Sequence, residues 1–178
     1  AAFIEPMACS MHTTERANIQ FEDVVVLAGA GTLGLGIVQA AALKHPKKLV
    51  VLDTIEARLE LAKKFGADVV INPAKEDALK AILDMTDGYG CDVYIEATGN
   101  PRGAVQGLEM TRKLGRFVEM SVFGADVTAD WSIIGDRKEL DILGAHLGPY
   151  CYDTVISLLE RGLITSKGIV THTFDLDH

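Results

Sequence analysis

The feature that most constrains the fold is a set of three glycines between two apolar runs, in the stretch VVVLAGAGTLGLGIVQAA that begins at Val24. The run before the glycines has the length of a strand, whereas the apolar residues after them recur with a helical period. Gly29 allows a sharp turn, Gly31 lets a pyrophosphate approach the backbone, and Gly34 lets the helix pack tightly on the strand. Because a helix begins with free N–H groups and a positive dipole, this pattern predicts a dinucleotide-binding bend.

A second apolar run ends in Asp53, at the distance of about twenty residues that is typical of the acidic residue in dinucleotide-binding units. A carboxylate in this place accepts hydrogen bonds from the adenosine ribose hydroxyls and repels a 2′-phosphate, which favours NAD over NADP. Arg58 weakens this preference, since its charge could attract that phosphate. The alternative is a purely structural turn in which Asp53 caps the next helix.

Apolar runs of strand length alternate with segments of helical period along the rest of the chain. The runs cover residues 24–28, 49–53, 69–71, 92–96, 116–121 and 140–145. The helical segments cover residues 33–43, 56–65, 75–86, 102–113 and 150–161, and Glu5-Pro6 opens a further helix before them. This alternation predicts a doubly wound parallel sheet with helices on both faces. Residues 124–138 are the least regular and predict a loop with a short helix.

The composition of the chain limits which binding partners and which cellular compartment we expect. The chain has 178 residues and a formal charge of -8 without a basic stripe, so we expect no nucleic-acid partner. No apolar run is long enough to span a bilayer, and no signal-peptide pattern is present, so we expect no membrane partner. Three dispersed cysteines do not make a disulfide framework, which favours the cytoplasm. The chain begins without methionine inside apolar sequence, and we expect a fragment of a longer protein.

With these motifs in place, the chain resembles the coenzyme domain of medium-chain, zinc-dependent alcohol and polyol dehydrogenases, of the sorbitol, threonine, butanediol and erythritol or threitol type. The resemblance rests on FIEPMACSMH, LDTIEARLELAKKFGAD, DVYIEATGN, LGRFVEMSVFG, ELDILGAH and GIVTHTFDL together with the glycine stretch. It implies a Rossmann-type doubly wound parallel sheet of about six strands. It further implies an N-terminal helical segment over residues 1–23, an NAD-binding domain over 24–166 and a return segment over 167–178.

The resemblance also implies an activity. The full-length protein would oxidise a small secondary alcohol or polyol to a ketone by hydride transfer to NAD, with zinc held mostly outside these residues. The fragment alone would be inactive and would contain no catalytic residue. The family's dimers imply a homo-oligomer, a dimer or tetramer, in which the sixth strand pairs with its copy at a sheet edge.

The resemblance extends the cofactor site along the carboxyl ends of the strands. Thr32 and Leu33 would offer amides to the pyrophosphate, and Arg58 would lie beside the adenosine ribose. The turn after the fourth strand would flank the adenine, and segments after the fifth and sixth strands would receive the nicotinamide through their backbone. The residues of these two parts are Ala97, Thr98 and Gly99 for the adenine side and Val122, Ala145 and Leu147 for the nicotinamide end. Ordinary loop and core roles are the alternatives for Thr98 and Val122.

The metal-binding candidates are few. Glu5 matches a position near the catalytic zinc of the polyol branch, although its charge would equally suit the first turn of a helix. Cys9 and His12 share a helix face, but one pair does not complete a zinc site, and packing or surface roles are favoured. His146 follows the sixth strand and faces either the cofactor or solvent.

Two other functions fit parts of the pattern. An NAD(H)-sensing module would bind the cofactor without chemistry, and Glu5 and the order of the family motifs argue against it. A methyltransferase that uses S-adenosylmethionine also has a glycine turn and an acid after its second strand. The GAGTLG spacing and the number of apolar runs argue against that second function.

Overall fold

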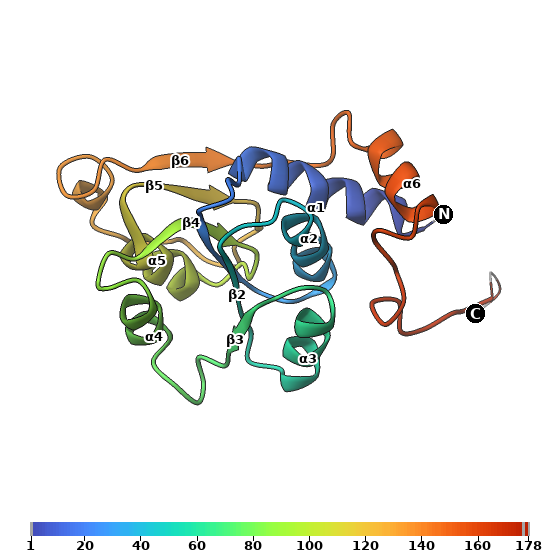
Figure 1. The fold of residues 1–178 in the computed structure, drawn as a ribbon, viewed down its shortest axis with the longest axis horizontal. Helices are drawn as coiled ribbons and strands as arrows, with labels where there is room; N and C mark the ends of the chain where they lie inside the picture. Colours follow the sequence, from blue (N-terminus) through green and yellow to red (C-terminus); the bar gives the residue numbers. More distant parts are fainter. Residues whose placement is uncertain (1, 176, 178) are drawn as a thin grey trace.

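The computed structural model describes residues 2–175 and 177, and its centre is a parallel sheet of six strands in the order β3-β2-β1-β4-β5-β6 (Figure 1). The strands are β1 Val24–Ala28, β2 Lys48–Leu52, β3 Val69–Ile71, β4 Cys91–Glu96, β5 Thr111–Glu119 and β6 Asp141–Gly144. The helices are α1 Ile4–Ala17, α2 Thr32–Ala42, α3 Glu56–Lys64, α4 Ala78–Met85, α5 Pro101–Met110 and α6 Tyr152–Glu160. The predicted doubly wound α/β fold is therefore confirmed, with its strand order reversing between β1 and β4.

The helices cover both faces of the sheet and give it two cores. In Figure 1, α1, α2 and α3 lie on one side of the strands, and α4 and α5 on the other. Along β1, Val25 and Leu27 join the first core, whereas Val26 and Ala28 join the second. A strand that is buried on both sides cannot alternate with polar residues, which explains why its sequence is continuously apolar.

The first helix packs directly on the helix that follows the glycine bend. A Cβ on Gly36 of α2 would lie 2.4 Å from the Ser10 hydroxyl and 2.8 Å from the Met7 sulfur of α1, so the two helices approach closely. The Ser10 hydroxyl also donates to the Leu33 carbonyl at 2.8 Å. The N-terminal helix thus supports the start of α2, while the division of the chain at residues 23 and 166 stays a prediction.

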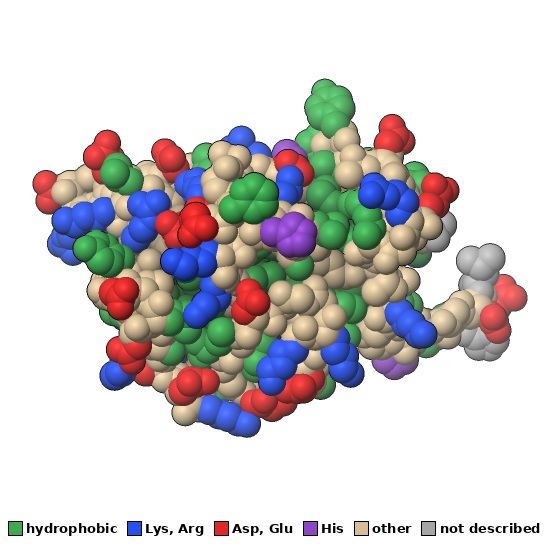
Figure 2. All heavy atoms as spheres, in the orientation of Figure 1, with side chains coloured by type: hydrophobic (Ala, Val, Ile, Leu, Met, Phe, Trp, Pro, Cys, Tyr) green, Lys and Arg blue, Asp and Glu red, His purple; other side chains and the backbone are tan. Residues whose placement is uncertain are grey.

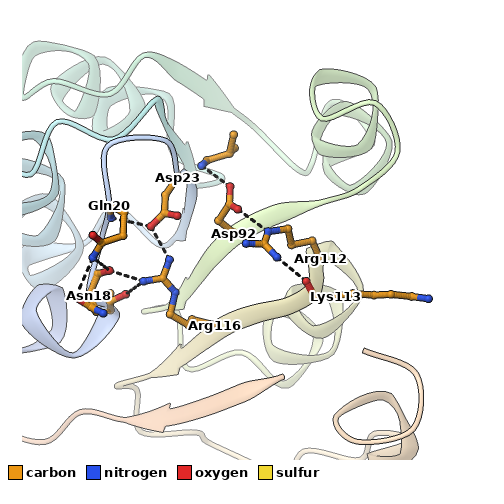
Figure 3. A network of polar contacts seen from close by, with 9 residues as sticks. Asn18, Gln20, Asp23, Asp92, Arg112, Lys113 and Arg116 are labelled. Carbon is orange, nitrogen blue, oxygen red and sulfur yellow. Dashed lines mark hydrogen bonds and ion pairs between the residues drawn. The ribbon is translucent and has the colours of Figure 1, made fainter. Parts of the chain in front are cut away.

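Ion pairs tie together the amino end of the sheet, opposite the carboxyl ends of the strands (Figure 3). Arg116 of β5 donates to Asp23 at 2.6 Å and to carbonyls at the end of α1. Asp92 of β4 accepts from the Val24 amide at 2.7 Å and pairs with Arg112. These contacts fix the entry into β1 relative to β4 and β5.

The predicted boundary between α5 and β5 was wrong. The helix ends at Met110 and the strand begins at Thr111, whereas the sequence pattern placed the helix through residue 113 and the strand from residue 116. The Lys138 ammonium group, from a segment far along the chain, donates to the carbonyls of Leu108, Glu109 and Thr111 and so ends the helix early. The predicted short helix within residues 124–138 is confirmed as a single 3-10 turn, Trp131–Ile133.

The surface carries charges of both signs. Figure 2 shows acidic and basic side chains interspersed over the visible face, and hydrophobic side chains gathered where α1 and α6 lie. On α6 itself, Tyr152 and Ile156 are partly exposed. Among the residues that the structure describes, no helix is both long and apolar enough to cross a membrane.

Candidate cofactor-binding site

A cleft of about 650 Å³ opens at the carboxyl ends of β1, β2 and β4, where the strand order of the sheet reverses. In open sheets of this type, ligands bind at this switch point. The structure brings six of the predicted site residues together in its walls: Gly29, Gly31, Asp53, Arg58, Ala97 and Thr98. Residues from three separate segments therefore converge on one cavity.

The three glycines have the backbone geometry that their spacing predicts. Gly29 has φ +100°, and its amide donates to the Leu52 carbonyl at 2.7 Å, which turns the chain at the end of β1. A Cβ on Gly34 would lie 2.0 Å from the Gly29 carbonyl oxygen, so the start of α2 touches the bend. Gly31 has no atom within 4 Å of the place that a Cβ would take, and its backbone is open to a ligand.

The first turn of α2 presents backbone donors beside the bend. The helix begins at Thr32, and its first amide that bonds back to the bend is that of Leu35, which donates to Gly31 at 2.8 Å. The N–H groups of Thr32 and Leu33 precede it and have no carbonyl of their own helix to reach. This turn contains no acidic side chain, so no residue of the helix itself neutralises the positive end of its dipole.

Asp53 joins the end of β2 to the glycine bend. Its Oδ2 accepts from the Ala30 amide at 2.8 Å, its Oδ1 accepts from the Ile55 amide at 2.8 Å, and Arg58 lies 3.6 Å away. Ile55 is the N-cap of α3, so Asp53 does not cap that helix as the structural alternative required. A carboxylate has lone pairs beyond these two bonds, and a sugar hydroxyl can use them.

The turn after β4 is held by a residue that sequence reasoning missed. Glu96 is fully buried, and its carboxylate accepts from the amides of Thr98 and Gly99 at 2.9 and 3.2 Å. A charged residue directly after the apolar run of residues 93–95 was the signal that could have found it. Thr98 lines the cleft, whereas Gly99 stands behind it, where an added Cβ would lie 2.6 Å from the Val122 carbonyl.

The three residues predicted for the nicotinamide end lie outside the cleft. Val122 and Leu147 are exposed, at 94% and 59%, and Ala145 is half-buried where its amide extends the ladder by donating to the Glu119 carbonyl at 2.8 Å. They follow β5 and β6 and share the carboxyl edge with the cleft.

Burial raises the pKa of the Glu119 carboxyl group at the end of β5. A hydrogen bond from the Ser121 amide lowers this pKa, and the nearby Glu96 raises it further.

Further residues that the sequence did not indicate complete the walls of the cleft. Pro73 and Ala74 come from the loop after β3, and Asn100, Arg102 and Gln106 from the start of α5. Asn100 is the N-cap of α5 and stands before a proline, which is a sequence signal for a helix start. The β3 loop gave no such signal, because its position depends on a buried side chain, Asn72, that bonds to α3.

The metal candidates do not form a site within the described residues. Glu5 is exposed in the first turn of α1, and its Oε1 accepts from the Cys9 thiol at 3.2 Å. Burial, together with the bond to Glu5, raises the pKa of Cys9 to about 11. Over residues 2–175 and 177, no group of three or more His, Cys, Asp or Glu side chains is placed to hold a metal ion. His146 is exposed beyond β6.

Fold and cleft together define a dinucleotide-binding α/β domain of the Rossmann type, with its ligand cleft at the switch point of the sheet. Residues 32–161 match the family model described as zinc-binding dehydrogenase. The chain belongs to this family, and the resemblance inferred from its motifs is confirmed.

Known relatives agree with the family. An erythritol/L-threitol dehydrogenase from Mycolicibacterium smegmatis is 55% identical over 99% of this chain and 49% of its own length. Among solved structures, a short-chain alcohol dehydrogenase from Escherichia coli with bound NADH gives a TM-score of 0.89 at 31% identity, covering 100% of this chain and 52% of its own. A zinc-binding dehydrogenase from Sinorhizobium meliloti with bound NADP gives 0.86 at 28% identity, covering 92% and 49%. This chain spans about half the length of the curated relatives that it matches.

Proposed function

We propose that this chain is the NAD(H)-binding part of a zinc-dependent dehydrogenase that oxidises a secondary alcohol or polyol to a ketone. The observation that carries the proposal is the cleft, where an open glycine bend and the carboxylate of Asp53 face one cavity at the switch point of the sheet. The relatives support the substrate class, since they include an erythritol/L-threitol dehydrogenase and a sorbitol dehydrogenase.

The residues around the cleft fit a dinucleotide. The open space at Gly31 admits a phosphate beside the backbone, and the amides of Thr32 and Leu33 would hold it. Asp53 would accept hydrogen bonds from the ribose, with Arg58 beside it. The adenine would lie against the turn of Ala97, Thr98 and Gly99, and the nicotinamide against the backbone at Val122, Ala145 and Leu147. When bound, NAD+ supplies the hydride acceptor of the reaction.

NAD is proposed over NADP because of the charge at Asp53. Its side chain is only 7% exposed and accepts two amides, so it cannot turn away from a 2′-phosphate without breaking those bonds. Arg58 lies 3.6 Å away and offsets part of this charge. A negative group facing the 2′ position disfavours the phosphate of NADP by repulsion.

Calorimetric titration of the chain with NAD+, NADP+ and S-adenosylmethionine tests this proposal. We expect NAD+ to bind and NADP+ to bind about tenfold more weakly. Asp53→Asn should lower the affinity for NAD+ about tenfold, because a charge-assisted hydrogen bond is lost. Asp68→Asn is the matched control, since its carboxylate accepts the Leu49 amide at the other end of β2. Binding of S-adenosylmethionine instead of NAD+ would indicate a methyltransferase.

The activity belongs to the full-length protein in this proposal, and the chain alone should be inactive. The test is to incubate the full-length gene product with NAD+ and a panel of polyols, including erythritol and L-threitol, and to follow NADH by absorbance. Reduction of NAD+ with a polyol supports the dehydrogenase. Tight NAD+ binding without turnover of any alcohol would indicate a sensing module instead.

The zinc site is assigned to the full-length protein as well, with Glu5 contributing from α1. The described residues offer no cluster that fits the ion, so no chemical step is assigned to it. Glu5→Gln should lower the zinc content of the full-length protein, measured by elemental analysis. Glu15→Gln on the same helix, which removes an exposed contact with Lys44, should not. Equal zinc content in both variants would remove Glu5 from the site.

Assembly and compartment complete the proposal. We infer a homo-oligomer that pairs through β6, because this strand lies at the edge of the sheet and Ile142 is 41% exposed on it. We place the protein in the cytoplasm, because Cys9, Cys91 and Cys151 are free thiols, as a reducing compartment keeps them.

A further inference from the structure

A carboxyl group with no exposed surface lies at the carboxyl end of β4. Glu96 is 0% exposed, and none of the ion pairs within residues 2–175 and 177 includes it. Burial of a carboxylate without a cation is strongly unfavourable unless hydrogen bonds compensate for the lost water. Its contacts therefore indicate what the residue does.

Every hydrogen-bond partner of the Glu96 carboxyl group in the described structure is a donor from the same turn. Oε1 accepts from the Thr98 amide at 2.9 Å and from the Thr98 hydroxyl, and Oε2 accepts from the Gly99 amide at 3.2 Å. Both oxygens of this carboxyl group are therefore used as acceptors, whereas a glutamine side chain in its place would have only one accepting oxygen. Glu96 thus closes the turn of residues 97–99 onto the end of its own strand.

That turn stands between the two halves of the proposed cofactor site. On one side, a Cβ on Gly29 would lie 2.6 Å from the Ala97 carbonyl oxygen. On the other side, a Cβ on Gly99 would lie 2.6 Å from the Val122 carbonyl oxygen. The turn therefore fills the space between the glycine bend and the segment after β5, and a shift of the turn would displace both.

The same carboxylate also reaches the helix that lines the cleft. The Thr98 hydroxyl, which donates to Glu96, accepts from the Asn100 amide at 2.9 Å. The Asn100 side chain in turn accepts from the Arg102 amide at 3.0 Å and caps α5. A continuous chain of hydrogen bonds thus runs from the buried strand end to the start of α5.

We propose that Glu96 is a positioning residue for the cofactor cleft, which acts through Thr98 and Gly99 and holds the shared wall of the adenosine and nicotinamide halves. This inference rests on the proposed function, because it assigns Glu96 a role in that site. It predicts that the two accepting oxygens of Glu96 affect cofactor affinity without any contact between Glu96 and the ligand.

The test compares Glu96→Gln with Asp92→Asn, which makes the same chemical change on the same strand at the other end of the sheet. We expect Glu96→Gln to weaken NAD+ binding about tenfold by calorimetry, as the loss of a charge-assisted bond does. Asp92→Asn should leave the affinity unchanged at a temperature where both variants are folded. In amide NMR spectra, Thr98, Gly99 and Gly29 should shift in Glu96→Gln only.

A double-mutant cycle checks that Glu96 acts through Thr98. Thr98→Val removes the hydroxyl and Thr98→Ser keeps it, so valine should weaken NAD+ binding more than serine does. In the Thr98→Val background, Glu96→Gln should weaken NAD+ binding by a further factor of about three or less, because the coupled contact is already lost. If Glu96→Gln does not fold, the comparison of valine with serine carries the test.

Three results would be decisive against this role. Unchanged NAD+ affinity in Glu96→Gln, fully additive losses in the cycle, or equal affinities of Thr98→Val and Thr98→Ser would each overturn it. A wild-type chain that binds no NAD+ refutes the proposed function instead. In that case the amide shifts of Thr98 and Gly99 still decide whether Glu96 holds the turn.

Discussion

At the scale of single residues, the ends of three strands use the same chemistry. Asp53 after β2, Glu96 at the end of β4 and Glu119 at the end of β5 each accept from the amide two residues further along. Such a side-chain bond to the following backbone helps to turn the chain out of the sheet. Among the strands in the described part of the chain, only β1 is followed at once by a glycine of positive φ, which fits the exposed backbone that a phosphate requires.

Alanine substitutions at Gly34 and Gly31 separate packing from ligand access. Gly34→Ala would place Cβ 2.0 Å from a backbone oxygen, so we expect a loss of about 2 kcal/mol in unfolding free energy and no NAD+ binding. Gly31→Ala meets no atom within 4 Å, and its stability should change little. Its NAD+ affinity should nevertheless fall, because the new Cβ occupies the phosphate space. Urea unfolding measures the stability of the two variants, and calorimetry measures their NAD+ affinity. An unchanged NAD+ affinity in Gly31→Ala would contradict phosphate binding at the glycine bend.

The raised pKa of Glu119 predicts a dependence of stability on pH. Burial chiefly raises this pKa above the usual 4.5, so the folded state favours the protonated form. The stabilisation of the folded state by this preference is complete below pH 4.5 and is lost as the pH rises through the folded-state pKa. Glu119→Gln keeps an acceptor for the Ser121 amide and should raise the melting temperature at neutral pH, with a gain that shrinks on acidification.

Glu56 provides a control of opposite sign for this measurement. Hydrogen bonds from Lys75 and then Asn72 lower its pKa, so its ionised form stabilises the fold above the unfolded-state value. Glu56→Gln should therefore lower the melting temperature slightly at neutral pH, where Glu119→Gln raises it. Parallel pH profiles of the two variants would contradict the assignment of the Glu119 shift to burial.

At the scale of whole elements, the two ends of the sheet have different structural roles. The carboxyl end carries open backbone and the cleft, whereas the amino end is closed by ion pairs between the entry into β1 and the neighbouring strands. Such a division lets one end hold the elements in register while the other stays accessible. The stability of the chain should therefore depend most on the amino end.

Arg116→Met tests this division. The side chains of Arg116 and Asp23 are 16% and 9% exposed, and removal of one partner leaves a largely buried charge unpaired. We expect a loss of about 3 kcal/mol in unfolding free energy. Arg137→Met, which breaks an ion pair with Asp130 at 57% and 58% exposure, should change the unfolding free energy far less, because solvent already screens this pair. Equal effects in urea unfolding would show that burial of the pair does not matter.

At the scale of the whole molecule, β6 is the open side of the sheet. The Ala145 amide donates inward to Glu119, so the backbone groups of Leu143 share that direction and those of Ile142 and Gly144 face away. This leaves a row of outward backbone groups at the edge, beside the 41% exposed side chain of Ile142, and within this row the Gly144 carbonyl already accepts from the Arg16 side chain at 3.0 Å. A second copy of the chain can complete this row across a two-fold axis.

Ile142→Pro tests pairing at this edge. Proline removes an outward amide and blocks an added strand, while the inward bonds to β5 stay in place. We expect a dimer for the wild-type chain and a monomer for the variant in analytical ultracentrifugation. Urea unfolding of the monomeric variant at low concentration controls for damage to the fold. A wild-type monomer at high concentration would contradict the proposed assembly of this chain.

Local patterns in the sequence determined much of this structure. The order of strands and helices, the glycine bend and the place of Asp53 follow from periodicity and from residues that allow only certain backbone geometries. Right-handed crossovers then give the doubly wound sheet, which the structure confirms. These properties depend on residues that are close to one another in the sequence, so the sequence alone is enough to predict them.

Tertiary structure alone decided the remaining parts. The end of α5 is set by Lys138, the loop beside the cleft by Asn72, and the wall of the cleft by Glu96. In the first two cases the partners come from different segments of the chain. In the third, the turn matters only because Gly29 and Val122 pack against its two sides. Contacts of this kind leave no periodic trace in the sequence, because their geometry exists only once the sheet has brought the segments together.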